Sequence, residues 1–168
     1  MQNVECKYEL RDLALARGVI ARLGGKHVIT VQQRDTYFKV PDGRLKRREC
    51  AGEPTEWIFY HRQNRSGPRL SHFQIYGEEE ALARYGVAPL PVLAVVEKTR
   101  EVWMKDGVRL HIDDVPGLGQ FFEIEALVTP DRHLGIARRI VDAIVAELRP
   151  VLGEPLSLGY AEMMAADR

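Results

Sequence analysis

Regular alternation of charged and apolar side chains along many short segments is the feature that most constrains the fold of this chain. In the segment 44–48, for example, Arg44, Lys46 and Arg48 occupy every second position. Side chains of a strand alternate between its two faces, so these three cations share one face. Because a period of two dominates the chain, the sequence predicts a sheet-rich fold.

Turn-forming residues divide the chain into hairpins instead of alternating strands and helices. The strongest turn signals are Pro41-Asp42-Gly43 and Asp106-Gly107, and a further polar turn is predicted at Arg34-Asp35. The predicted strands cover 3–10, 27–33, 37–40, 44–49, 57–62, 71–76, 92–105, 108–114 and 120–128, with a short one near 156–160. This order favours an α+β fold built on an antiparallel sheet that can close on itself.

Helix signals are fewer. Asp12 is predicted to cap a helix over 13–23, and a short helix is predicted before Gly86. A third helix is predicted to begin with Thr129 as its cap and Pro130 at its first position. These helices are expected to cover the apolar side of the sheet.

Composition excludes several classes of protein. The chain has 168 residues, treated as a single domain over 1–168, and its 24 Lys and Arg balance 24 Asp and Glu, which gives no support for a nucleic-acid partner. Cys6 and Cys50 lack the spacing of a zinc site or disulfide framework, which indicates reduced thiols in a cytoplasmic protein. The first residues carry no apolar signal core and no apolar run is long enough to span a membrane, so no membrane partner is expected.

The charges on the polar faces are sorted by sign from strand to strand. Three strands carry only cations at alternate positions: Arg44, Lys46 and Arg48 on one, Arg62 on another, and Lys98 and Arg100 on a third. The strand over 120–128 carries only anions, Glu123 and Glu125. Any half-exposed strand shows a charged and an apolar face. A solvated surface, however, usually mixes signs within a strand, because like charges two residues apart repel.

A ligand that carries both phosphates and a metal explains this sorting. Arg and Lys side chains bind phosphate oxygens, and carboxylates bind Mg²⁺ or Mn²⁺ together with phosphate oxygens. The strand over 108–114 adds Arg109, His111 and Asp113 on one face. The sequence therefore predicts a metal-bound polyphosphate on the charged face, with the apolar face free to pack against helices.

Several motifs, taken in order, resemble those of the CYTH family. Asn3–Lys7 (NVECK) is similar to the ExExK signature of that family, with Asn in place of the first Glu. The further motifs are DTYF at 35–38, GRLKRRE at 43–49, WIFYHR at 57–62, VEKTR at 96–100, RLHID at 109–113 and GLGQFFEIE at 117–125. The resemblance implies the triphosphate tunnel fold, an eight-stranded antiparallel β-barrel with flanking helices.

The resemblance also implies roles for individual residues. The implied metal ligands, for Mg²⁺ or Mn²⁺, are Glu5, Asp113, Glu123 and Glu125. The implied phosphate-binding residues are Lys7, Arg44, Lys46, Arg62, Lys98, Arg100 and Arg109. Catalytic roles fall to Glu5, Lys7 and His111. Each of these residues has a solvated or structural charge as its alternative, and His111 can equally be a hydrogen-bonding partner of Asp113.

The Asn3 variant of the signature resembles the class IV adenylyl cyclase branch of the family. That branch implies conversion of ATP to cyclic AMP and pyrophosphate. Loss of one carboxylate puts two-metal hydrolysis in doubt. Two alternatives stay open: a tripolyphosphatase or nucleoside triphosphatase that cleaves the terminal phosphate, and a non-catalytic polyphosphate- or nucleotide-binding protein. The expected partner is a nucleoside triphosphate or inorganic tripolyphosphate, and the family is compatible with a homodimer.

Overall fold

A computed structural model describes residues 1–86 and 90–166 of the chain. Its elements are, in order, β1 (Gln2–Leu10), α1 (Leu13–Arg22), β2 (Lys26–Phe38), β3 (Arg44–Cys50), β4 (Glu56–Arg62), β5 (Arg69–Tyr76), α2 (Glu78–Tyr85), β6 (Val92–Lys105), β7 (Val108–Val115), β8 (Gly119–Leu127), α3 (Leu134–Leu148), η1 (Arg149–Val151), β9 (Leu152–Leu156) and α4 (Tyr160–Ala166). Among the described helices, none has the length and apolar character needed to cross a membrane.

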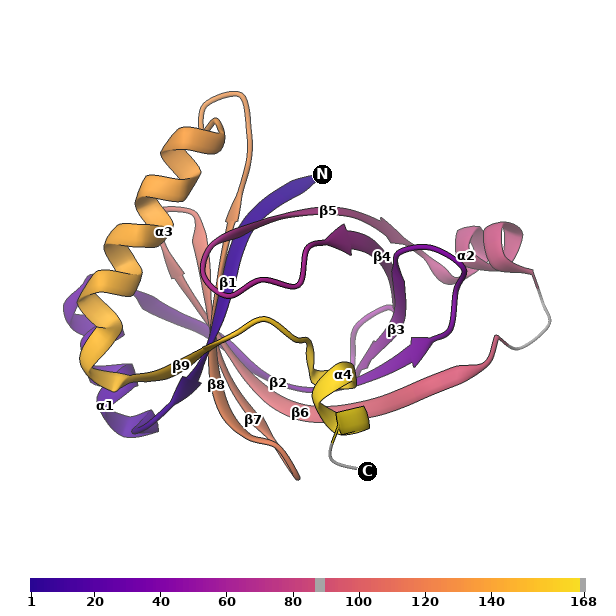
Figure 1. The fold of residues 1–168 in the computed structure, drawn as a ribbon, viewed down its shortest axis with the longest axis horizontal. Coiled ribbons are helices and arrows are strands. Elements are labelled where there is room, and N and C mark those ends of the chain that lie inside the picture. The colour runs from indigo at the N-terminus through magenta and orange to yellow at the C-terminus, as the bar shows by residue number, and fades with distance from the viewer. Residues whose placement is uncertain (87–89, 167–168) are drawn as a thin grey trace.

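The strands form a closed antiparallel barrel, which Figure 1 shows as a ring. Their order is β5-β4-β3-β2-β6-β7-β8-β1, and the first half of β1 pairs with β5 to close the ring of eight. In this closing pair, Asn3 lies opposite Ser71 and Glu5 lies opposite Arg69. The second half of β1 pairs with β9. The predicted α+β class and eight-stranded barrel are therefore confirmed.

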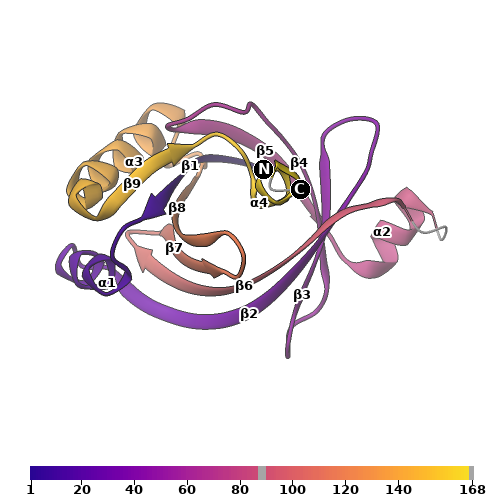
Figure 2. The same ribbon diagram turned by 60° about the horizontal axis from the view of Figure 1, so that its bottom comes forward.

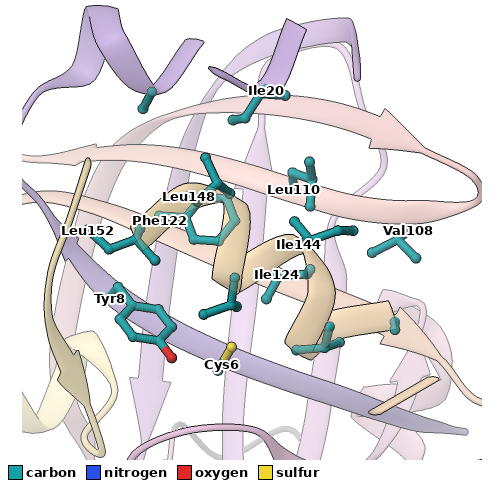
Figure 3. Close-up of a cluster of buried hydrophobic side chains, with 14 of the residues drawn as sticks. Cys6, Tyr8, Ile20, Val108, Leu110, Phe122, Ile124, Ile144, Leu148 and Leu152 are labelled. Carbon is teal, nitrogen blue, oxygen red and sulfur yellow. The ribbon is translucent and has the colours of Figure 1, made fainter. Parts of the chain in front are cut away.

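The main apolar core lies outside the barrel wall, between the strands β1, β7 and β8 and the helices α1 and α3 (Figures 1 and 3). Ile144 and Leu148 of α3 pack against this wall, where Leu110 of β7 and Ile124 of β8 are fully buried. Burial of such side chains contributes about 1.5–3 kcal/mol each. Because the apolar faces point outward to these helices, the alternate positions point into the barrel.

A second aromatic cluster fixes α2 on the opposite side of the barrel from α1 and α3 (Figure 2). The ring of Trp57 on β4 stacks on Phe38 of β2, with centroids 5.2 Å apart, and on Tyr85 of α2 at 6.4 Å. Phe59 packs at the edge of the same cluster. The helices therefore cover the outer surface of the barrel on two sides.

Two local predictions are confirmed. Asp12 caps α1, and its side chain accepts a 2.9 Å hydrogen bond from the Leu15 backbone N–H. Asp106 and Gly107 form the turn between β6 and β7, with φ values of +50° and +77°. Asp and Gly tolerate these left-handed conformations, which suit a two-residue hairpin turn.

Three predicted boundaries are wrong. No turn interrupts the chain at Arg34-Asp35, because β2 runs without a break and Asp35 is buried among cations inside the barrel. Thr129 does not cap α3, which starts at Leu134 after His133. The Thr129 oxygen and carbonyl instead accept hydrogen bonds from the Arg132 N–H in a tight turn. In the tail, the strand β9 comes earlier than predicted, and a helix, α4, follows it.

Candidate active site inside the barrel

The barrel encloses a cavity of about 430 Å³ whose wall is rich in charged side chains. The residues predicted from the sequence that line it are Glu5, Lys7, Lys46, Arg62, Lys98, Arg100, Arg109, Glu123 and Glu125. Three predicted residues, Arg44, His111 and Asp113, are not part of its lining. The charged faces of separate strands therefore do converge on one enclosed space.

Carboxylates gather on the wall formed by β1 and β8. Glu5 and Glu125 are directly opposite one another in the pairing of these strands. Ligand atoms of Glu123, Glu125 and His111 all lie within 4.8 Å of one another. Burial, together with Glu123 and Glu5 beside it, raises the pKa of Glu125 to about 8. A divalent ion offsets such repulsion, and carboxylate oxygens are the ligands that Mg²⁺ and Mn²⁺ prefer, so this donor set fits the predicted metal.

His111 contacts Glu123 from the side away from the cavity, and its imidazole ring is neutral. Its Nδ1 atom is 3.2 Å from Oε1 of Glu123, and the residue is buried. Burial, with Arg100 adding to it, lowers the pKa of His111 to about 4. An uncharged imidazole at this position can orient the Glu123 carboxylate by a hydrogen bond.

Lys7 and Arg62 border the carboxylates on either side. The Lys7 Nζ atom lies 3.5 Å from Oε2 of Glu123, and burial lowers the pKa of Lys7. Arg62 donates a 3.2 Å hydrogen bond from Nη1 to Glu5. Its Nε–H group is buried and has no partner among the described residues. Since buried donors are rarely left unpaired, this group can bind an acceptor such as a phosphate oxygen.

Cations dominate the opposite wall, where they surround Asp35. Arg48 donates two 2.8 Å hydrogen bonds to the two oxygens of Asp35, and Lys98 donates a third at 2.7 Å. The Lys46 Nζ atom is 3.7 Å from the same carboxylate. Burial alone would raise the pKa of Asp35, but these three cations hold it well below its usual value. The sequence pattern alone did not reveal this role, because a polar residue between two strand signals is typical of a turn.

The lysines of this cluster are weak bases. Burial, together with the nearby guanidinium groups and Lys46, lowers the pKa of Lys98 to about 7 even though Asp35 opposes the shift. Burial and Arg48 lower the pKa of Lys46 to about 8. A polyphosphate entering the cavity would favour the charged form of both side chains.

Arg100, Asp113 and Tyr160 form a closed hydrogen-bonded group. Arg100 donates two 2.7 Å hydrogen bonds to Asp113, and the Tyr160 hydroxyl donates another at 2.6 Å. Both oxygens of Asp113 are therefore used within the protein. Arg100 holds the pKa of Asp113 well below its usual value in spite of burial. The geometry suits an orienting role for Asp113 better than the predicted metal ligation.

The C-terminal helix α4 packs against β6, and Figure 1 draws it in front of the lower edge of the ring of strands. The ring of Tyr160 sits 3.5 Å from the Lys7 Nζ atom. Glu162 accepts a 2.8 Å hydrogen bond from Nε of Arg44, which also binds Asn64. Arg44 thus contacts α4 instead of the cavity.

A buried arginine, which was not among the residues predicted from the sequence, supports this arrangement. Arg69 is one of the largest fully buried side chains, and its Nη1 atom donates hydrogen bonds of 3.0 Å to the Arg65 carbonyl and 2.6 Å to the Ser157 carbonyl. Its Nε atom is 3.8 Å from Glu5. Arg69 therefore ties the segment before α4 to the carboxylate wall. The spacing of two residues between Arg69 and Ser71 was the available signal, but the predicted strand began only at residue 71.

The fold and the cavity together define a class of protein: a closed antiparallel barrel with carboxylates on one inner wall and cations on the opposite one. The CYTH domain model matches residues 1–151. The chain belongs to the CYTH family, as its motifs indicated.

Solved structures of low sequence identity share the fold. A conserved hypothetical protein from Pyrococcus furiosus has a TM-score of 0.74 at 20% identity, over 95% of this chain and 98% of that one. A putative adenylate cyclase from Vibrio parahaemolyticus has a TM-score of 0.73 at 15% identity, over 97% of both chains. A Hippeastrum protein, described as a putative adenylyl cyclase with a dominant triphosphatase activity, has a TM-score of 0.60 at 16% identity, over 98% and 94%. No curated protein matches the sequence.

Proposed function

We propose that this chain is a metal-dependent enzyme that holds ATP in the barrel and converts it to cyclic AMP and pyrophosphate, as class IV adenylyl cyclases do. One observation carries the triphosphate-binding part of the proposal, and the Asn3 form of the ExExK signature favours the cyclase reaction. The carboxylates Glu5, Glu123 and Glu125 lie on β1 and β8, whereas Lys46, Arg48 and Lys98 lie across the ring on β3 and β6. A triphosphate between these walls meets cations on one side and a metal site on the other.

The cations position the ligand and stabilise the leaving group. Lys46, Lys98 and Arg100 line the cavity and can hold the β- and γ-phosphates, while Lys7, next to Glu123, suits the α-phosphate. Pyrophosphate leaves with additional negative charge, and fixed cations in a buried site stabilise that charge. In this proposal the protein contributes mainly by positioning and by electrostatics.

Glu5, Glu123 and Glu125 would hold the Mg²⁺ or Mn²⁺ ion, with His111 orienting Glu123. The bound ion supplies charge neutralisation and a lowered pKa for an attacking hydroxyl. In the proposed reaction the ribose 3′-oxygen forms a bond to the α-phosphorus, the bond to the bridging oxygen of the β-phosphate breaks, and the hydroxyl proton is released to solvent.

A triphosphatase is the second candidate, supported by the activity described for the Hippeastrum structure. The same clamp would then hold the ligand while water attacks the terminal phosphate. Incubation with ATP and with inorganic tripolyphosphate, each with Mg²⁺ and with Mn²⁺, separates the two. Cyclic AMP with pyrophosphate supports the cyclase, and orthophosphate supports the phosphatase. Tight binding without any product in either metal would mean a non-catalytic binding protein.

A further inference from the structure

Beyond the carboxylate cluster, the cavity changes character in steps toward an apolar mouth. Lys7, Glu5 and Asn3 are alternate residues of β1 that all line it, and each step along a strand of two residues covers about 7 Å. Glu5 lies opposite Glu125, and Asn3 lies opposite Leu127. Asn3 is therefore one step further toward the mouth than the carboxylates.

At the first step two uncharged polar side chains lie between Arg62 of β4, which pairs with Ser71, and Leu127 of β8, which pairs with Asn3. Asn3 on β1 and Ser71 on β5 face one another in the strand pairing that closes the barrel, and both line the cavity. Neither side chain is hydrogen-bonded to another residue within 1–86 and 90–166. An amide and a hydroxyl can both donate and accept hydrogen bonds. This pair can therefore donate hydrogen bonds to sugar hydroxyls and accept hydrogen bonds from them. Phosphate oxygens only accept hydrogen bonds, so the cations that line the rest of the cavity bind them better.

The second step is apolar. Phe73 follows Ser71 by two residues on β5 and lines the cavity beside Tyr60, its partner on β4. Ile75, the next inward residue of β5, and Leu127, the partner of Asn3 on β8, also line the cavity, and 43% and 37% of their surfaces are exposed. Apolar side chains that lie together at the surface are a feature of ligand-binding grooves. An inorganic polyphosphate would leave this part of the wall uncovered, whereas a flat base would cover it.

We infer that Asn3 and Ser71 form a subsite for the sugar hydroxyls, and that Phe73, Ile75 and Leu127 form a subsite for the base of a nucleoside triphosphate. The order of carboxylates, then Asn3 and Ser71 with Leu127 beside them, then Phe73 and Ile75, matches the order of α-phosphate, sugar and base along a nucleotide. The inference rests on the proposed triphosphate site and makes a nucleotide, instead of inorganic tripolyphosphate, its ligand. It also assigns Asn3 a role in specificity at the position where the ExExK signature has its first Glu.

Binding of ATP and of inorganic tripolyphosphate tests the subsites when it is measured by calorimetry without divalent metal, so that turnover does not interfere. The variants are Asn3→Ala, Ser71→Ala and Phe73→Leu. Phe59→Leu is the matched control, because Phe59 lies on the outer face of the neighbouring strand. Phe73→Leu should weaken ATP binding about five- to a hundred-fold, because stacking of the base on the aromatic ring is lost. Asn3→Ala and Ser71→Ala should each weaken ATP binding about three- to ten-fold.

The affinity for tripolyphosphate distinguishes loss of the nucleoside subsites from loss of the triphosphate site. This affinity should stay unchanged in all three cavity variants. The control Phe59→Leu should change the affinity for neither ATP nor tripolyphosphate. Equal losses for ATP and tripolyphosphate, or no loss for either, would overturn the subsites while leaving triphosphate binding intact. If wild-type protein bound neither ligand, the proposed function itself would fail.

Discussion

Arg44 donates a 2.8 Å hydrogen bond to Glu162, so a cation of β3 predicted to bind phosphate is held by the C-terminal helix α4. Arg44 has no part in the cavity lining, whereas Lys46, two residues along the same strand face, has. The two positions therefore separate binding of the ligand from anchoring of the helix.

We predict opposite effects for these two cations. Lys46→Ala should weaken ATP binding about ten- to a hundred-fold, because it removes a charged hydrogen-bond donor. Arg44→Ala should leave the affinity nearly unchanged and should release α4, measured as faster proteolysis near Ala161. Glu162→Gln should reproduce the proteolysis. If Arg44→Ala lost as much affinity as Lys46→Ala, the guanidinium would have to reach the phosphates.

Metal-dependent turnover should depend on Glu123 and Glu125. Replacement of both by Gln keeps their size and removes two ionised oxygen ligands, so activity should fall by at least about a hundred-fold. Titration with Mn²⁺ should show weakened binding of the ion. Glu97→Gln, on the exposed face of β6, is the control and should be neutral. Full activity in the double variant would rule out this metal site.

ATP binding should take up protons. At pH 8.5 Lys98 and Lys46, with pKa values of about 7 and about 8, are mostly neutral in the empty cavity. ATP phosphates are already ionised there, and they favour the charged lysines, so uptake of one to two protons is expected. Calorimetry in buffers of different ionisation enthalpy measures it, and Lys98→Met should lower it.

The sign for stability follows from the same pKa value. The pKa of Lys98 is lowered from its value near 10.5 in the unfolded chain to about 7 in the folded protein. Between these values the unfolded chain binds the extra proton, so Lys98 contributes a stability that rises with pH across that window. A wild-type stability that rises less steeply than that of Lys98→Met from pH 7 to 10 would contradict the assignment.

Removal of the carboxylate among the cations should destabilise the protein. Asp35→Asn leaves Arg48, Lys98 and Lys46 without their counter-charge, and loss of one partner from a buried ion pair costs about 3–5 kcal/mol. Denaturant unfolding measures this cost. Tripolyphosphate should restore more stability to this variant than to wild type, because it supplies the missing charge. Asp114→Asn, exposed on β7, is the control.

The sequence was sufficient for the parts of the site that depend on strand periodicity. Lys98 and Arg100, or Glu123 and Glu125, share a face whatever the strands beside them, so their convergence could be predicted once a closed sheet was assumed. The role of Asp35 could not, because its partners Arg48 and Lys98 come from two other strands. Tyr160 was missed for the same reason: only the folded chain brings α4 to Lys7.

Closure of the barrel by β1 and β5 has a consequence for the growing chain. β1 is made first, yet its partners on β5 and β8 are made about 65 and 120 residues later, since Glu5 pairs with Arg69 and with Glu125. Contacts this distant in sequence form slowly. During synthesis, Glu5 of β1 therefore lies in an open sheet, and the metal site can form only after β8, the last barrel strand, has left the ribosome.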